Sequence, residues 1–122
     1  MRIQDHVEKA RRIEATMTGK LDRDGDYELV LEGYMLAGTH LLNAILHKLA
    51  VTKEDFDLLH SDKPVLEAPV ETRLQPFFAA MRYIEDLRPG YLRGLKPWRT
   101  EDGKGCAEMY EKVKRFAEQV LG

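Results

Sequence analysis

The stretch 27-YELVLEGYMLAGTHLLNAILHKLAV-51 decides the fold of this chain. It contains no proline, and residues 33 to 47 include no charged side chain. A helix that is apolar around most of its circumference is normally enclosed by other helices. We therefore expect a core helix from about Asp26 to Leu49, and we expect the remaining elements to pack around it.

The same stretch is too short and too polar for a membrane span. Its 15 uncharged residues fall below the roughly 20 that are needed to cross a bilayer. They also include His40, His47 and Asn43, which need hydrogen-bond partners. The pattern predicts the central helix of a bundle.

Composition places the chain among small single-domain proteins. With 122 residues and a mass of 14.1 kDa, one domain over residues 1–122 can bury a core without further cross-links. The net charge of −2 does not favour general nucleic-acid coating. Cys106 is the only cysteine, which excludes an intramolecular disulfide and suits a reducing compartment. The opening MRIQDHVEKARR lacks a continuous apolar segment of a signal peptide, so we expect a cytoplasmic location.

Apolar residues at steps of three and four predict amphipathic helices on both sides of the core helix. The first helix has the stripe Ile3, Val7, Ala10, Ile13, Met17 and Leu21. The stretch LDRDGD (21–26) ends it and offers aspartates that can cap the core helix. After the core helix, Thr52 and Asp55 have the spacing of a capping box, which predicts a short helix.

The second half of the chain predicts two further helices. The prolines and polar residues of 61–69 predict a loop, and Pro69 suits the first turn of the helix that follows. Pro76 lies inside the helical pattern and predicts a kink or a delayed start. Residues 88–99 read as an irregular connector, and the last helix begins after Thr100. Its stripe contains Cys106, Met109, Tyr110, Val113, Phe116, Ala117 and Val120. The fold class is all-α: four main helices and one short helix in an up-and-down bundle.

The histidines are the first candidates for a functional site. His40 and His47 are seven residues apart, so they share a helix face but are separated by about 10.5 Å along the axis. Helical metal sites normally use a spacing of three or four. His60 follows Asp57 with that spacing, but the second carboxylate–histidine pair of a di-iron bundle is absent. His40, His47, Asp57 and His60 are therefore candidate metal or small-ligand residues, and hydrogen-bonded core histidines are the alternative.

Other patterns favour ordinary structural roles. Asp22, Asp24 and Asp26 alternate as in a calcium loop, but Gly33 stands where the loop needs a bidentate glutamate. This predicts a capping turn. Ser61, the only serine, has no defined catalytic partner. Cys106 lies on an apolar stripe, where thiols are usually inert.

A second candidate site is the basic connector RPGYLRGLKPWR, residues 88–99. It combines basic and aromatic side chains and contains no acid: Arg88, Tyr91, Arg93, Lys96, Trp98 and Arg99. Such a loop suits a phosphate, single-stranded nucleic acid or an acidic partner. The alternative is that the aromatic residues attach the connector to the bundle while the basic residues stay in solvent.

Three segments resemble the HEPN-type helical bundles, which are small prokaryotic domains often found beside nucleotidyltransferases or in toxin–antitoxin and RNA-cleaving systems. They are 37-AGTHLLNAIL-46, 58-LLHS-61, and a helix ending at Asp86-Leu87-Arg88 with Tyr91 close behind. The resemblance covers about residues 28–95 and implies a helical bundle that dimerises. The arginine–histidine motif of the nucleolytic members is missing. The pair that comes nearest to this motif is Arg2 and His6, but the interval between them is one residue too short and the pair lies in the wrong helix. Ribonuclease chemistry is therefore not implied.

Three functional hypotheses follow. Because no complete catalytic set is present, the first is a non-catalytic module without a cofactor that forms a homodimer or binds a protein partner. Its basis is the small-residue seam of Gly33, Ala37 and Ala44, which permits close helix approach within or between chains. The second is a metal- or small-ligand-binding bundle, conceivably an enzyme. The third is RNA or nucleotide binding through residues 88–99.

Overall fold

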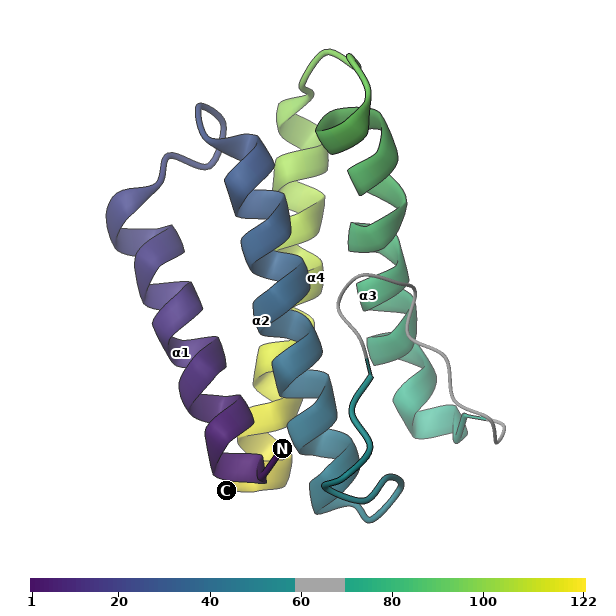
Figure 1. Ribbon diagram of the computed structural model, residues 1–122. Helices are drawn as coiled ribbons and strands as arrows, with labels where there is room; N and C mark the ends of the chain where they lie inside the picture. The colour runs from purple at the N-terminus through teal and green to yellow at the C-terminus, as the bar shows by residue number, and fades with distance from the viewer. Residues whose placement is uncertain (59–69) are drawn as a thin grey trace.

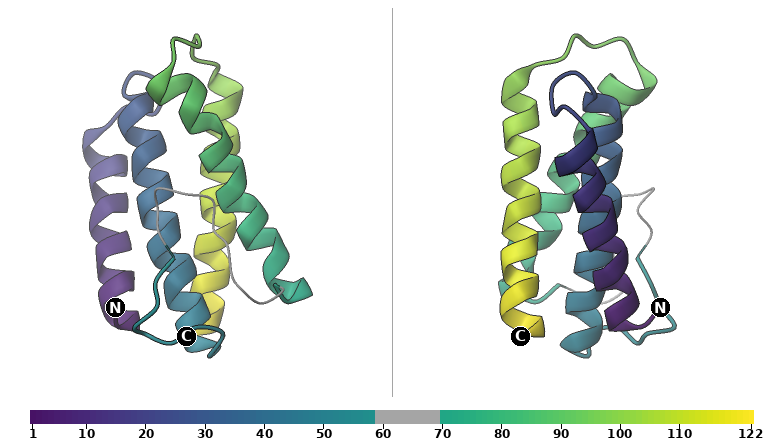
Figure 2. Two further views of the ribbon diagram at one scale, coloured as in Figure 1. Left: turned by 45° about the vertical axis from the view of Figure 1, so that its right-hand side comes forward. Right: turned by 90° about the vertical axis from the view of Figure 1, so that its left-hand side faces the viewer.

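The computed structural model describes residues 1–58 and 70–122. It contains four α-helices: α1 (Ile3–Lys20), α2 (Tyr27–Lys48), α3 (Gln75–Arg88) and α4 (Thr100–Leu121). Consecutive helices run in opposite directions, and both termini lie at one end of the bundle (Figures 1 and 2). No strand occurs in either described range. The predicted all-α, up-and-down bundle is confirmed.

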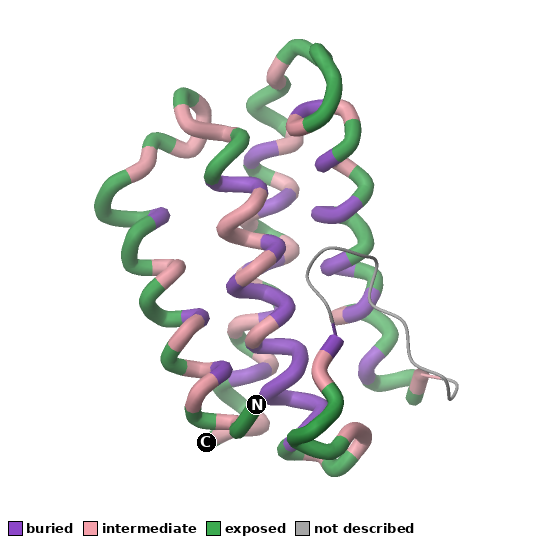
Figure 3. The backbone as a smooth tube through the Cα atoms, viewed as in Figure 1, coloured by how far each residue is buried: buried purple, intermediate pink, exposed green. Residues whose placement is uncertain are grey.

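Helix α2 is the centre of the bundle. It packs against each of the other three helices, and α3 also packs against α4. Buried positions follow α2 along most of its length (Figure 3). Ala37 and Ala44 are completely buried, and a Cβ added at Gly33 would come within 2.3 Å of Met17 Sδ in α1. The small-residue seam therefore brings helices together within the chain.

By length and composition, α2 is also the one described helix that could cross a membrane. Its most apolar window is 67% buried inside the bundle. Burial of this kind is typical of a core helix.

The end of α2 is a Schellman turn. Ala50 has a φ of 57°, the left-handed region that usually favours glycine. The amide of Ala50 donates to the His47 carbonyl, and the amide of Val51 donates to the Leu46 carbonyl over 2.9 Å. These bonds satisfy the last carbonyls of the helix and reverse the chain, so that residues 52–58 return toward the side of α2.

The predicted short helix beginning at Thr52 is wrong for residues 52–58, which form a bend, a turn and irregular backbone. The reason is tertiary. Buried Asn43 in α2 donates to the Leu58 carbonyl over 3.1 Å and accepts from the Leu58 amide over 2.8 Å. These bonds hold backbone groups that a helix would have used itself.

The remaining boundaries follow the prolines and aspartates. A single 3₁₀ turn, Thr72–Leu74, precedes α3, and Pro76 lies in the first turn of α3, so the delayed start is confirmed. Residues 89–93 continue α3 as a π-helical turn, so the first half of the predicted irregular connector is helical. Residues 61–69, including Pro69, lie outside the described residues.

The aspartate loop is a turn, but its aspartates do not cap α2. Asp26 makes no side-chain cap bond to that helix. Its carboxylate instead accepts from the Asp22 amide over 2.8 Å, while the Asp22 carboxylate accepts from the Gly25 amide over 2.6 Å. The carboxylates therefore fold the loop itself.

Candidate metal centre

His6 is the residue that assembles the candidate site. It lies on the buried stripe of α1, three residues after Ile3 and four before Ala10, and only 1% of it is exposed. The ring stands between two histidines of α2, with centroids 5.2 Å from that of His40 and 5.3 Å from that of His47. A side chain from a neighbouring helix thus bridges the seven-residue interval that a single helix cannot close.

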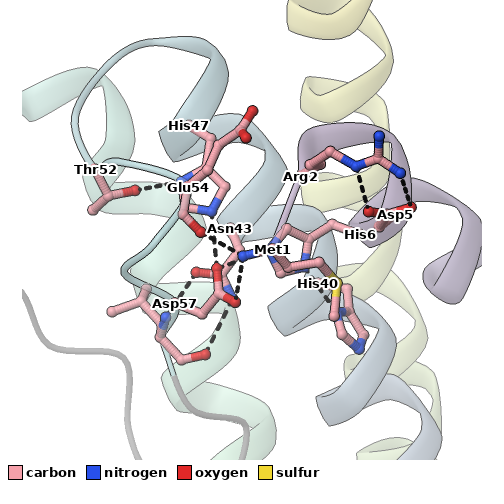
Figure 4. Close-up of polar contacts among 11 residues, drawn as sticks. Met1, Arg2, Asp5, His6, His40, Asn43, His47, Thr52, Glu54 and Asp57 are labelled. Carbon is pink, nitrogen blue, oxygen red and sulfur yellow. Dashed lines mark hydrogen bonds and ion pairs between the residues drawn. The ribbon is translucent and has the colours of Figure 1, made fainter.

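Two histidines meet one carboxylate in the same cluster (Figure 4). Asp57 Oδ1 lies 2.9 Å from His6 Nε2 and 2.9 Å from His47 Nε2. The His47 side chain is completely buried, while that of Asp57 is 31% exposed. The site is therefore closed by histidines on the inside and open to solvent at the carboxylate.

The outer nitrogens of both rings also have partners. His6 Nδ1 lies 2.9 Å from His40 Nδ1, and His47 Nδ1 lies 2.8 Å from Thr52 Oγ1. Such contacts fix the rotation of an imidazole ring and determine which nitrogen carries its hydrogen. Both Nε2 atoms are consequently directed toward Asp57.

Local folding places Asp57 opposite the histidines. The Schellman turn at Ala50 reverses the chain, and the bonds from Asn43 hold the neighbouring Leu58. The Met1 amino group lies 3.1 Å from the second carboxylate oxygen, Oδ2, and also donates to the Glu54 carbonyl. Asp57 is thus held by its backbone neighbour and by contacts to both of its oxygens.

The cluster is electrostatically suited to a cation. Burial of Asp57 raises the pKa of its carboxyl, but hydrogen bonds from His47, His6 and the Met1 amino group outweigh it and lower the pKa to about 2. Burial lowers the pKa of His6, although its hydrogen bond to Asp57 opposes that shift. At neutral pH the site therefore offers an ionised carboxylate and a neutral His6, which are the protonation states that metals bind.

The geometry also fits a metal. One ligand atom from each of His6, His47 and Asp57 can be chosen so that all lie within 4.8 Å of one another. Two bonds of about 2.05 Å at right angles end about 2.9 Å apart, as the contacts to Asp57 Oδ1 do. A tetrahedral centre needs about 3.3 Å between ligand atoms, which requires a small opening of the cluster.

Space is available beside two of these ligands. A cavity of about 160 Å³ is lined by His6, His40 and Asp57, together with Leu36, Thr39, Asn43 and Leu58. A water molecule occupies about 30 Å³ in the liquid, so the cavity can hold several waters or a small ligand. A metal with three protein ligands could therefore take a further ligand from this side.

The structure brings together three of the four metal candidates that the sequence suggested. Asp57 contacts His47 directly, while His40 reaches the cluster through His6. His60, like Ser61, lies outside the described residues. His6 and Thr52 were missed as site residues. The available signal was the spacing of His6 from Ile3 and Ala10, which puts a polar ring on the buried face of α1.

The basic connector is engaged by local acids and aromatic rings. Arg88 is almost buried and pairs with Glu85 and with Glu32, the latter over 2.6 Å. Arg93 lies 3.9 Å from Glu85. Pairing of this kind reduces the positive charge that is available to an anion.

The aromatic residues of the connector attach it to the opposite end of the bundle. Trp98 stacks on Tyr27 and donates from Nε1 to Asp24 over 2.9 Å. Tyr91 is buried, and its hydroxyl donates to Asp102. Lys96 lies over the ring of Tyr91 and 3.7 Å from Asp102. Arg99 is exposed. The contacts made by Tyr91 and Trp98 match the alternative in which the aromatic residues attach the connector to the bundle.

Cys106 is buried on the inner face of α4. Burial raises the pKa of its thiol to about 12, so almost none of the reactive thiolate exists at neutral pH. This environment is that of an inert core cysteine.

Comparisons with known proteins assign no family to this chain. No family model matches the chain, and no curated protein or solved structure matches it. The likeness to HEPN-type bundles stays a prediction.

Proposed function

We propose that this protein binds one divalent first-row transition-metal ion through His6 Nε2, His47 Nε2 and the Asp57 carboxylate. The observation that carries the proposal is the convergence of two imidazole nitrogens on one carboxylate oxygen, each at 2.9 Å. These atoms come from α1, α2 and the segment after α2, so these three parts of the chain must pack together before the atoms meet.

The donor set defines the class of ion. Two imidazoles and one carboxylate suit Fe²⁺, Mn²⁺, Co²⁺, Ni²⁺ and Zn²⁺, whereas Ca²⁺ and Mg²⁺ prefer oxygen ligands throughout. Three protein ligands leave positions for water or a small substrate, so the centre would be reactive and not merely structural.

The arrangement of outer contacts supports the same function. Metal-bound histidines typically donate the hydrogen of their second nitrogen to a nearby acceptor. Thr52 Oγ1 and His40 Nδ1 stand at that position for His47 and His6. Each of the two proposed histidine ligands therefore has an outer partner that can orient its ring when an ion binds.

The test compares two acids in the same loop. Asp57→Asn removes a proposed ligand, whereas Asp55→Asn makes the same charge change at an exposed side chain two residues away. Untagged protein is stripped with a chelator and titrated with Co²⁺, Ni²⁺, Zn²⁺ and, without oxygen, Fe²⁺ and Mn²⁺, using calorimetry and elemental analysis.

We expect one equivalent of ion to bind to the wild type and to Asp55→Asn, and binding to Asp57→Asn to be at least 10-fold weaker. The bound ion should also raise the thermal midpoint, since a ligand at 100 times its Kd adds about 2.7 kcal/mol. Failure of all five ions to bind to the wild type would overturn the proposal. Equal binding by the two variants would overturn the role of Asp57.

A further inference from the structure

The contact between His6 and His40 joins two identical ring nitrogens. Their Nδ1 atoms are 2.9 Å apart, a distance that requires a hydrogen bond between them. A neutral imidazole carries one hydrogen, on either Nδ1 or Nε2. One of the two facing nitrogens must therefore carry a hydrogen while the other accepts it.

Without a metal, the direction of this bond follows from Asp57. An ionised carboxylate only accepts, so His6 Nε2 must carry the hydrogen that bonds to Asp57 Oδ1. A neutral His6 then has only a lone pair at Nδ1. The hydrogen of the His6–His40 bond consequently belongs to His40 Nδ1.

A metal on His6 Nε2 reverses this direction. The ion needs the lone pair of Nε2, so the single hydrogen of His6 must move to Nδ1, where it faces His40. His40 Nδ1 must then accept, and the hydrogen of His40 must be on Nε2.

We infer that His40 is a positioning residue of the metal centre, which accepts a hydrogen bond from His6 and changes its tautomer when the ion binds. This inference rests on the proposed function. His6 Nε2–H gives its proton to water, the hydrogen of His40 Nδ1 passes to His6 Nδ1, and His40 Nε2 takes a proton from water. The two rings hold two hydrogens before and after. His40 is only partly buried and lines the cavity beside the cluster.

The same reasoning explains why His40 occupies its place on α2. It lies one heptad before His47 on the same face, and its Nδ1 contacts the ring of His6. Its Nδ1 fixes the rotation of His6, as Thr52 Oγ1 does for His47. Loss of such a partner typically weakens metal binding 10- to 100-fold.

The direct test is imidazole ¹⁵N NMR of the wild-type protein with diamagnetic Zn²⁺ at constant pH. On adding one equivalent, we expect His40 Nδ1 to change from a hydrogen-bearing to a lone-pair signal and His40 Nε2 to change in the opposite sense. A merely structural histidine would keep its tautomer. If Zn²⁺ binds and the His40 signals keep their original character, the inference is overturned and the metal site stands. If Zn²⁺ and the other ions do not bind, both fail.

A matched pair of variants provides the second test. The amide oxygen of His40→Asn can accept where Nδ1 accepts, whereas His40→Leu has a similar bulk and cannot accept. We expect His40→Leu to bind Zn²⁺ 10- to 100-fold more weakly than wild type, and His40→Asn to remain within about threefold, because one acceptor replaces another. Equal affinities of the two folded variants would contradict the role of His40. The NMR measurement decides the question if either variant fails to fold.

Discussion

Asn43→Ala tests how the candidate site is attached to the bundle. Asn43 is 1% exposed and bonds both the amide and the carbonyl of Leu58. The truncation leaves two backbone groups without their partner. Each unpaired buried group costs about 1–3 kcal/mol, and entry of water recovers part of this. We expect a loss of about 2–4 kcal/mol in the free energy of unfolding. For a chain of this size that corresponds to a fall in Tm of about 8–16 °C.

The assay is urea unfolding of chelator-treated protein, combined with amide hydrogen exchange at Leu58. Thr39→Val is the matched control on the same helix. It removes a buried hydroxyl that donates to the Met35 carbonyl over 2.7 Å, and should cost about 1 kcal/mol or less because that carbonyl also has its helical partner. In Asn43→Ala, the Leu58 amide should also lose protection before global unfolding, and metal binding should weaken because Asp57 is no longer held.

The reasoning is refuted if Asn43→Ala unfolds within about 1 kcal/mol of wild type, or if the Leu58 amide keeps its protection. Either result would show that residues 52–58 are held by something other than Asn43. Equal losses in Asn43→Ala and Thr39→Val would point to general disturbance of α2.

Three further predictions concern the rest of the fold. Burial raises the pKa of the Cys106 thiol from 9.0 to about 12, so the thiol ionises more readily once the protein unfolds. Above pH 9 this group should therefore lower the free energy of unfolding by about 1.4 kcal/mol per pH unit. Urea titrations at several pH values should show that Cys106→Ala lacks this contribution. Arg88→Met should cost up to about 3–5 kcal/mol in the same assay, because it removes the nearer basic partner of the nearly buried Glu85, leaves Arg93 at 3.9 Å as the remaining ion-pair partner among the described residues, and breaks the bond to Glu32. A loss below 1 kcal/mol would show that the pair is effectively solvated. Ala50→Gly should raise Tm by up to about 4 °C, since glycine adopts the left-handed conformation without the cost of about 1 kcal/mol that alanine pays, and an unchanged or lower Tm would contradict that account.

The helices could be predicted because their signals are local. Apolar residues at steps of three and four appear wherever a helix turns one face toward a core, and Pro76 sets a start that backbone geometry dictates. The error at Thr52 has the opposite origin. Its capping-box spacing is a weak local preference, and two buried hydrogen bonds from Asn43 override it.

The sequence by itself determined an all-α bundle around one helix whose residues 33–47 carry no charge, because periodicity and the absence of charge follow directly from burial. It also placed His40, His47 and Asp57 among the candidate ligand-binding residues. Only the tertiary structure decided that they belong to one cluster. A helix rises about 1.5 Å per residue, so His40 and His47, seven residues apart, cannot both bind one ion. The residue that joins them into one cluster, His6, is 34 residues from His40 and reaches it only because α1 packs along α2.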